Sequence, residues 1–353
     1  MYVVLAILVF GVLIFTHELG HFLTAKLFGV RVNEFAICMG PTLFQKKVGE
    51  TTYSLRLIPI GGFCAMEGED EASEDPRAFT SAKAWKRAVI LVAGSAMNFL
   101  TGLLVLVIMY STVVGFTTPQ IVDFYDDCPM HREDGLQVDD TLYEIDGRRV
   151  YIYSDVSMLL ARNTTGIYDL TVKRDGQLVK LDDFEMTTRP YEENGQTIYR
   201  YGLYFGYEDA NLGSILKNSW YTALDFARMV WMSLGDLVKG LVSIDDMSGP
   251  VGIVSVIAET GKTAESTAVA ALNITYLAAF IAVNLAVMNM LPIPALDGGR
   301  VFFLVINELA QLVLRRKIDP KYEGYIHAAG MLLLLAFVAF VSFKDIWKLF
   351  AGV

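Results

Sequence analysis

Four long stretches without Asp, Glu, Lys or Arg constrain the fold of this chain more than any other feature. The stretches are 1–17, which continues past Glu18 to 25, then 88–122, 266–296 and 324–343. Each is long enough for a helix to cross a bilayer, which takes roughly 20 residues. Of the 353 residues, 54% are hydrophobic and 19% are charged, whereas soluble domains are about 25% charged. The sequence therefore predicts an integral membrane protein with about four transmembrane helices.

Composition also excludes several other classes of protein. A chain this apolar is not disordered. Its net charge of −10 argues against a nucleic-acid partner. Cys38, Cys64 and Cys128 are too few for a disulfide framework and lack zinc-finger spacing, so we expect free thiols. The first stretch has no basic n-region and no small-residue cleavage site, which disfavours a signal peptide.

The distribution of charge between the stretches predicts the orientation. Segments 26–87 and 300–321 hold nine and five Lys and Arg residues, so we expect both to be cytoplasmic. Both termini and 123–265 would then lie outside. Region 115–213 holds nine basic and nineteen acidic residues, which accounts for the whole net charge. We interpret this region as an external module whose negative charge keeps it away from anionic lipid. An acidic binding patch is the alternative.

Short strands and turns characterise that external module. We expect a helix over 155–161 and a hairpin of 168–173 with 177–181, which has an Asp-Gly turn. The module resembles a bacterial PDZ domain, although residue 139 is Asp where that family usually has Gly. The resemblance rests on Pro129, Gly135-Leu136, Asp139-Asp140 and Ile145-Asp146-Gly147. PDZ domains bind strands or chain ends, but no clear carboxylate-binding loop is present, so peptide capture and a steric gate both remain open.

Segment 211–242 is apolar but interrupted by charged residues. These are Lys217, Asp225, Arg228, Asp236 and Lys239. Burying them in lipid is costly, so we expect an amphipathic helix in the outer interface, with an additional span as the alternative.

An H-E-x-x-H motif lies within the first apolar stretch. His17 and His21 are four residues apart, so a helix places both imidazoles on one face, where they can bind one metal ion. Glu18 beside them can act on a water molecule at that metal. Ionisable side chains in a span are expensive unless they are used. A polar cluster satisfied by neighbouring helices is the alternative.

A catalytic zinc ion needs a third protein ligand and one open position. At the end of the third stretch Pro292 and Pro294 must break the helix, because proline lacks an N–H and clashes with the preceding turn. Asp297 follows, and Gly298-Gly299 permit a tight return. We expect Asp297 to be the third ligand; capping of a helix that begins near Arg300 is the alternative.

These motifs together resemble the site-2 protease family of intramembrane zinc metalloproteases, especially its bacterial RseP/RasP group. The resemblance covers nearly the whole chain and rests on H-E-x-x-H, on N-x-x-P-x-P-x-L-D-G-G at 289–299, and on one PDZ-like module between spans two and three. It implies one zinc ion per chain. The implied roles are zinc ligand for His17, His21 and Asp297, general base for Glu18, and substrate binding for Asn289, Pro292 and Pro294. For Asn289, a hydrogen bond to a neighbouring helix is the alternative.

Two further segments agree with this resemblance. Residues 94–99 match a G-x-x-x-N-F segment of the family, although close helix packing explains their small side chains equally well. Strand-like pieces at 32–37, 51–58 and 62–66 match its membrane-dipping β-element. The glycine-rich turn there, which would meet the substrate, contains Gly61, Gly62 and Phe63. An exposed edge could pair with an unwound substrate; an ordinary cytoplasmic hairpin is the alternative.

The predicted fold is a polytopic α-helical membrane protein with a cytoplasmic-side, membrane-associated β-element and an inserted extracytoplasmic α+β PDZ domain. The predicted segments are a first transmembrane helix at 1–28, the β region at 29–86, a second transmembrane helix at 87–114, the PDZ domain at 115–208, amphipathic interfacial helices at 209–265, a third transmembrane helix at 266–300, a cytoplasmic loop or helix at 301–323 and a fourth transmembrane helix at 324–346.

The predicted function is hydrolysis of peptide bonds within single-span proteins of a bacterial cytoplasmic membrane, near its cytoplasmic side. A helix hides its carbonyls in hydrogen bonds, so the substrate must unwind first. The resemblance implies substrates already trimmed outside, such as anti-sigma factors or signal-peptide remnants. A non-catalytic PDZ adaptor is one alternative, against which the intact metal motifs count. A metal or proton transporter is another, but the sequence shows no inverted repeat.

Overall fold

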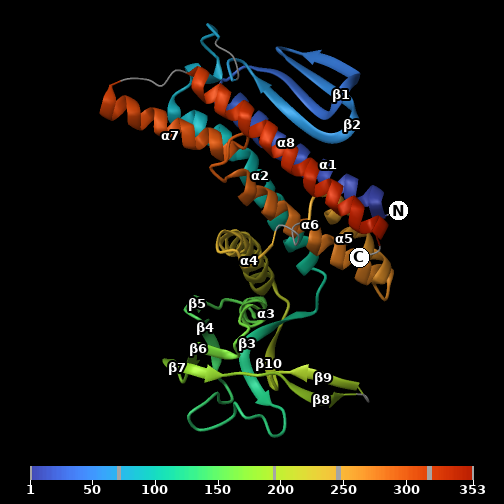
Figure 1. Cartoon of the computed structure of the whole chain (residues 1–353), viewed down its shortest axis with the longest axis vertical. Coiled ribbons are helices and arrows are strands. Elements are labelled where there is room, and N and C mark those ends of the chain that lie inside the picture. Colours follow the sequence, from blue (N-terminus) through green and yellow to red (C-terminus); the bar gives the residue numbers. More distant parts are fainter. Residues whose placement is uncertain (1, 70–72, 194–195, 244–247, 316–319, 352–353) are drawn as a thin grey trace. The chain divides into compact units, whose positions relative to one another are not determined.

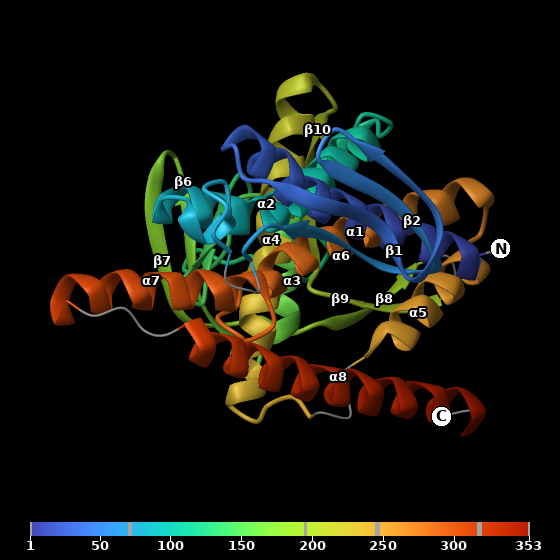
Figure 2. The same ribbon diagram turned by 90° about the horizontal axis from the view of Figure 1, so that it is seen from above.

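The structure, a computed structural model, describes residues 2–69, 73–193, 196–243, 248–315 and 320–351. Contacts divide the chain into two compact units. The first comprises Met1–Leu106 and Phe226–Val353, and the second comprises Val107–Asp225. Figures 1 and 2 show their elements.

Among the described residues, four helices are long and apolar enough to cross a membrane. They are α1 (Tyr2–Leu27), α2 (Ala84–Tyr110), α6 (Thr267–Asn289) and α8 (Pro320–Ala351). In the most apolar part of α8 only 6% of the residues are buried within the protein. Apolar surface left exposed on this scale suits a lipid environment. The four helices coincide with the four uncharged stretches, which confirms this part of the predicted fold.

The other helices of the chain are shorter or carry more charge. They are η1 (Phe79–Ser81), α3 (Tyr153–Arg162), α4 (Leu212–Val238), α5 (Pro250–Thr263) and α7 (Asp297–Leu314). The charged helix α4 is not among the four membrane candidates, which agrees with the interfacial placement expected for 211–242. An interfacial position for α4 stays a prediction.

The core of the first unit consists of two groups of buried apolar side chains. One joins the end of α1, the start of α2 and the first sheet, and comprises Ala25, Val30, Val32, Phe35, Cys64, Met66, Phe79, Ile90 and Leu91. The other joins α1, α5 and α6, and comprises Ala6, Leu13, Ile257, Ile274, Ile281 and Ala282. Both groups hold α1 in place, and α1 carries the H-E-x-x-H motif.

The sheet of the first unit is a folded hairpin of β1 (Val32–Val48) and β2 (Thr51–Met66). Residues 34–37 of β1 pair with 52–55 on one side and with 62–65 on the other. The pieces predicted from sequence are therefore three adjacent strand segments with 32–37 in the centre. Within the described residues, 62–66 pairs only with β1 and is an edge of the sheet. This sheet lies beside α1 (Figure 2).

The second unit is built on a six-stranded sheet. Five strands follow the order β10-β3-β4-β6-β7, and β5 pairs with β4. The strands are β3 (Gly115–Phe124), β4 (Thr141–Ile145), β5 (Arg148–Arg149), β6 (Ile167–Arg174), β7 (Gln177–Glu185) and β10 (Leu203–Asp209). The separate hairpin of β8 (Arg189–Glu193) and β9 (Gln196–Arg200) was not expected from the sequence.

The turns of the second unit follow the predicted chemistry. In Asp146-Gly147 and Asp175-Gly176 both residues have positive φ, as the tight turn between twisted antiparallel strands requires. Asp139 has a φ of +71°. This left-handed conformation favours glycine, and Asp is one of the few residues with a side chain that adopt it readily.

Candidate active site

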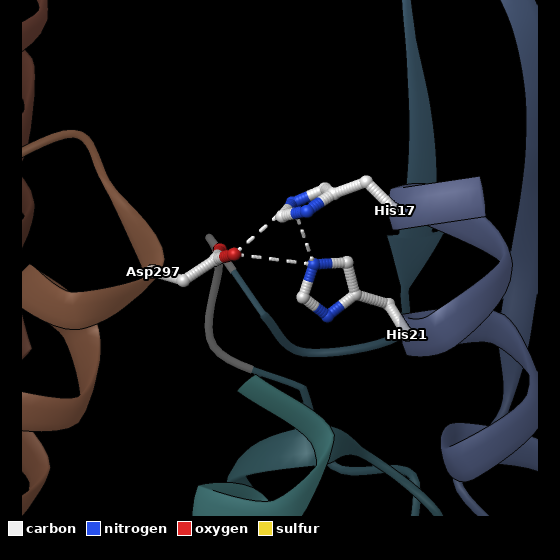
Figure 3. Close-up of side chains that lie close together, drawn as sticks. All are labelled: His17, His21 and Asp297. Carbon is white, nitrogen blue, oxygen red and sulfur yellow. Dashed lines mark hydrogen bonds and ion pairs between the residues drawn. The ribbon is translucent and has the colours of Figure 1, made fainter. Parts of the chain in front are cut away.

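His17 and His21 lie one helical turn apart on α1 and converge with the first residue of α7. Their Nε2 atoms are 3.2 Å apart. Asp297 Oδ2 lies 3.1 Å from Nε2 of His17 and 3.3 Å from Nε2 of His21. Figure 3 shows the three side chains meeting from two separate helices. The structure therefore brings the three expected metal ligands together.

The tautomer of His21 is fixed by its other ring nitrogen. Nδ1 lies 2.8 Å from the backbone carbonyl oxygen of Ile90 in α2. A carbonyl oxygen only accepts, so Nδ1 donates a proton and, in the neutral ring, Nε2 presents its lone pair to His17 and Asp297. Metal-binding histidines commonly donate their second N–H to a backbone carbonyl in this way. Only 6% of the residue is exposed, so packing restricts the position of its ring.

Asn289, at the end of α6, approaches the other histidine. Its side-chain nitrogen lies 3.5 Å from Nδ1 of His17. If Nε2 of His17 binds a metal, Nδ1 carries the proton and the amide presents its oxygen, since the two amide orientations fill the same space. This contact favours orientation of a ligand as the role of Asn289. The expected role in substrate binding stays a prediction.

The donor set fits a zinc ion. The ligand atoms of His17, His21 and Asp297 all lie within 4.8 Å of one another. Asp297 Oδ2 is buried and has no well-aligned hydrogen bond within the described chain. A carboxylate and two imidazole lone pairs at this separation repel one another unless a cation lies between them. Two nitrogens and one oxygen suit zinc and leave a fourth position open.

Helix α2 forms a wall of the site through Gly94. A Cβ added at Gly94 would lie 2.3 Å from His21 Nε2 and 2.7 Å from His17 Cε1. A Cβ at Gly20 of α1 would likewise lie 2.4 Å from the carbonyl oxygen of Ala93. Small residues therefore do allow close packing, as expected. In addition, the glycine at 94 makes room for the ligand rings, which the sequence did not reveal.

The loop between α6 and α7 determines the position of Asp297. Helix α6 ends at Asn289, before Pro292 and Pro294, as the proline break predicts. Helix α7 begins at Asp297 itself, with Leu296 as an N-cap that makes no side-chain hydrogen bond. The alternative that Asp297 caps a helix beginning near Arg300 is therefore wrong.

The two glycines after Asp297 allow the loop to fold back tightly. A Cβ at Gly298 would lie 2.3 Å from the carbonyl oxygen of Met290, and one at Gly299 would lie 2.3 Å from that of Ile293. Backbone atoms cannot move aside as side chains can. Any larger residue would displace the start of α7 and Asp297 with it.

The edge of β2 passes beside Glu18. A Cβ at Gly62 would lie 3.5 Å from Glu18 Cγ. Gly61 instead permits a φ of +86°, and the ring of Phe63 packs 4.9 Å from the guanidinium carbon of Arg56. Of the three turn residues expected to bind substrate, Gly62 is therefore the one placed against Glu18.

Two contributors to the site were missed by sequence reasoning. The carbonyl of Ile90 carries no side-chain signal at all. His327 in α8 accepts a hydrogen bond from the backbone N–H of Ala295, with an N–N distance of 3.0 Å. A signal for it existed, because it is one of only four histidines and lies inside the fourth apolar stretch.

Known proteins resemble this chain over almost its full length. The profile of peptidase family M50 matches residues 5–337. A Fusobacterium nucleatum protein named as a zinc metalloprotease is 36% identical over 358 residues, covering 98% of each chain. A Clostridium acetobutylicum protein with the same kind of name is 36% identical over 347 residues, covering 98% of this chain and 97% of the relative. The Bacillus subtilis regulator of sigma-W protease RasP is 27% identical over 430 residues, covering 99% of each chain.

Proposed function

This chain belongs to peptidase family M50, and on that premise we propose that it cuts single-span membrane proteins within their membrane helix. It is a zinc metalloprotease and an integral bacterial membrane protein of the kind that carries out intramembrane proteolysis. The observation that carries the proposal is the convergence of His17, His21 and Asp297 between apolar helices. Such polar side chains are costly in a membrane unless they have a function.

Each residue of the site has a distinct role in the proposed reaction. Nε2 of His17, Nε2 of His21 and Oδ2 of Asp297 would hold the zinc ion. When bound, zinc supplies a Lewis acid that activates water and polarises the scissile carbonyl. The Glu18 carboxylate takes the proton of the attacking water and later gives it to the leaving amine.

The edge of β2 provides a place for the unwound substrate. Residues 62–66 pair with β1 on one side, and Gly62 lies against Glu18. A substrate strand added to the other side would bring its backbone next to the general base. Because a helix must first open, substrates with small or helix-breaking residues near the site are preferred. Pro292, which is exposed, and Pro294 are proposed to flank the bound strand.

The orientation of the chain follows from its charges. The nine basic residues of 26–87 are proposed to lie in the cytoplasm, which puts the active site toward that side and both termini outside. The acidic second unit then lies outside. We assign 115–208 of it to a PDZ domain; the six-stranded sheet and α3 support this assignment. Its proposed role is to exclude substrates that still carry a large external domain.

The proposed substrates are membrane-bound regulators or peptides that another protease has already trimmed. Anti-sigma factors and signal-peptide remnants are the leading candidates. The name of the Bacillus subtilis relative, regulator of sigma-W protease, supports the first class. The experiment below uses a generic reporter, so that it tests the chemistry separately from the choice of natural substrate.

Cleavage of a reconstituted single-span reporter with a truncated external domain tests the proposal. The native chain, Glu18→Gln and the matched exposed-residue control Glu259→Gln are compared, and bound zinc is quantified in each. We expect cleavage by the native chain and Glu259→Gln only, with zinc retained in all three. Absence of zinc from the native chain, or its retention after both histidines are replaced, would exclude this ligand set. Undiminished cleavage by Glu18→Gln would exclude Glu18 as the base.

A further inference from the structure

The loop that precedes Asp297 has an intrinsically unfavourable backbone conformation. Pro292 and Pro294 have no backbone N–H to donate, and Ala295 has a φ of +80°. A residue with a side chain adopts this conformation only when its surroundings enforce it. Backbone outside a helix is also costly at membrane depth unless protein satisfies it. Something outside the loop must therefore hold it in this conformation.

Helix α8 supplies two contacts to this loop. Nδ1 of His327 accepts the N–H of Ala295 at 3.0 Å. One turn further along the helix, a Cβ added at Gly330 would lie 2.4 Å from Pro294 Cβ and 3.0 Å from the Pro294 carbonyl oxygen. The loop thus packs directly against the backbone of α8 at Gly330, and the imidazole of His327 holds it there. The two contacts fix adjacent residues, one of them the strained one.

The same imidazole also packs against the helix that Asp297 begins. Its ring centroid lies 5.4 Å from that of Phe303 in α7, at an interplanar angle of 61°. The side chain is only 15% exposed. His327 therefore touches both the loop before Asp297 and the helix after it, and its position restricts the direction in which the Asp297 carboxylate points.

We propose that His327 and Gly330 are positioning residues for zinc, which act on Asp297 by fixing the loop 290–296 against α8. Both act through the backbone of Pro294 and Ala295. The fourth membrane helix, which contributes no ligand of its own, becomes part of the metal site by this route. This inference rests on the proposed assignment of Asp297 as a zinc ligand.

The test measures how fast the full-length protein in detergent loses zinc to a chelator. His327→Leu removes the acceptor, whereas His327→Asn keeps an acceptor atom bonded to Cγ, as in histidine. We expect zinc loss to become about 10–100-fold faster in His327→Leu and to return toward the native rate in His327→Asn. Reporter cleavage should fall in parallel in kcat, and KM should rise as well, because Pro292 and Pro294 of the same loop are proposed to flank the bound strand.

Two matched controls separate positioning from general weakening of α8. Asp345 on the same helix also accepts backbone N–H groups, from Gly249 and Gly252 at 2.8 and 2.9 Å. Asp345→Asn should lower the melting temperature and leave the rate of zinc loss unchanged. Gly330→Ala should accelerate zinc loss, whereas Gly324→Ala, where an added Cβ meets nothing within 4 Å, should not.

The outcomes distinguish this inference from the proposed function. A native chain that binds no zinc refutes the ligand assignment itself. Zinc bound by the native chain and lost at the same rate from His327→Leu refutes positioning by His327 and leaves the ligands standing. Equal acceleration in Asp345→Asn also refutes it, because the effect would then be one of general stability.

Discussion

Replacing Gly94 with alanine tests the geometry of the metal site most directly. The added Cβ would lie 2.3 Å from His21 Nε2, whereas unbonded heavy atoms prefer about 3.5 Å. About 1 Å of movement is therefore required. The imidazole cannot rotate away, because its Nδ1 donates to the Ile90 carbonyl at 2.8 Å. Either that hydrogen bond breaks or Nε2 leaves the position it shares with the other ligands.

This change has two opposing effects on stability, which nearly cancel. Its effect on activity has no such compensation. Alanine in a helix is favoured over glycine by about 1 kcal/mol, and overpacking costs about 1–3 kcal/mol. The net change in the free energy of unfolding should stay below about 2 kcal/mol. A displacement of about 1 Å at a catalytic site, however, costs about 100-fold in rate. We therefore expect Gly94→Ala to fold, to lose zinc and to cleave the reporter at least about 100-fold more slowly.

A second glycine of α2 provides the control for this experiment. A Cβ at Gly102 would lie 2.9 Å from Val283 Cγ2 of α6, so Gly102→Ala overpacks the same helix without touching the ligands. Zinc content, reporter cleavage and thermal unfolding are measured for both variants. If Gly94→Ala keeps zinc and activity near the native level, His21 does not lie where the structure places it. If Gly102→Ala loses zinc equally, the cause is helix packing and not contact with the ligands.

Two groups of oppositely charged side chains give further predictions. Arg174 binds both oxygens of the buried Asp140 at 2.8 and 2.7 Å. Arg174→Ala should destabilise the second unit by about 3–5 kcal/mol, because it leaves a buried charge unpaired. A second unit that still resists cleavage in limited proteolysis of that variant would contradict this. Lys26 and Arg77 hydrogen-bond to Glu50 and lower its pKa from 4.5 to about 2. The stability contributed by Glu50 is present above pH 4.5 and is lost as the pH falls through about 2. The melting temperatures of the native chain and Glu50→Gln should therefore differ near neutral pH and converge at low pH; a difference independent of pH would refute the assignment.

Sequence reasoning succeeded where one local rule governs the outcome. Helical spacing put His17 and His21 on one face, and the prolines after Asn289 located the break that precedes Asp297. Asp-Gly pairs located the turns of the second unit. Each of these follows from backbone geometry within a few residues, so no knowledge of the partner elements was needed.

Sequence reasoning failed where the outcome depends on contacts between segments that are distant in the chain. The pairing of β10 with β3 joins residues 79 to 94 positions apart, for example Phe205 with Ile121, and no local signal specifies it. Ile90 acts through its backbone carbonyl, a group that every residue has. Gly94 was recognised as small, but only the distance to the His21 ring shows why it must be.

The two histidines and the aspartate of the proposed ligand set are held in position in different ways. This difference determines which part of the site is most sensitive to perturbation. His17 and His21 sit on an unbroken helix, so their spacing is set by the helical repeat and survives small shifts of α1 as a whole. Asp297 follows a loop with two prolines and a strained Ala295, whose conformation depends on contacts with α8. Weak perturbations of packing should therefore change zinc binding through Asp297 long before they separate the two histidines. A change in the position of α8 relative to this loop is then sufficient to alter the activity without altering any ligand.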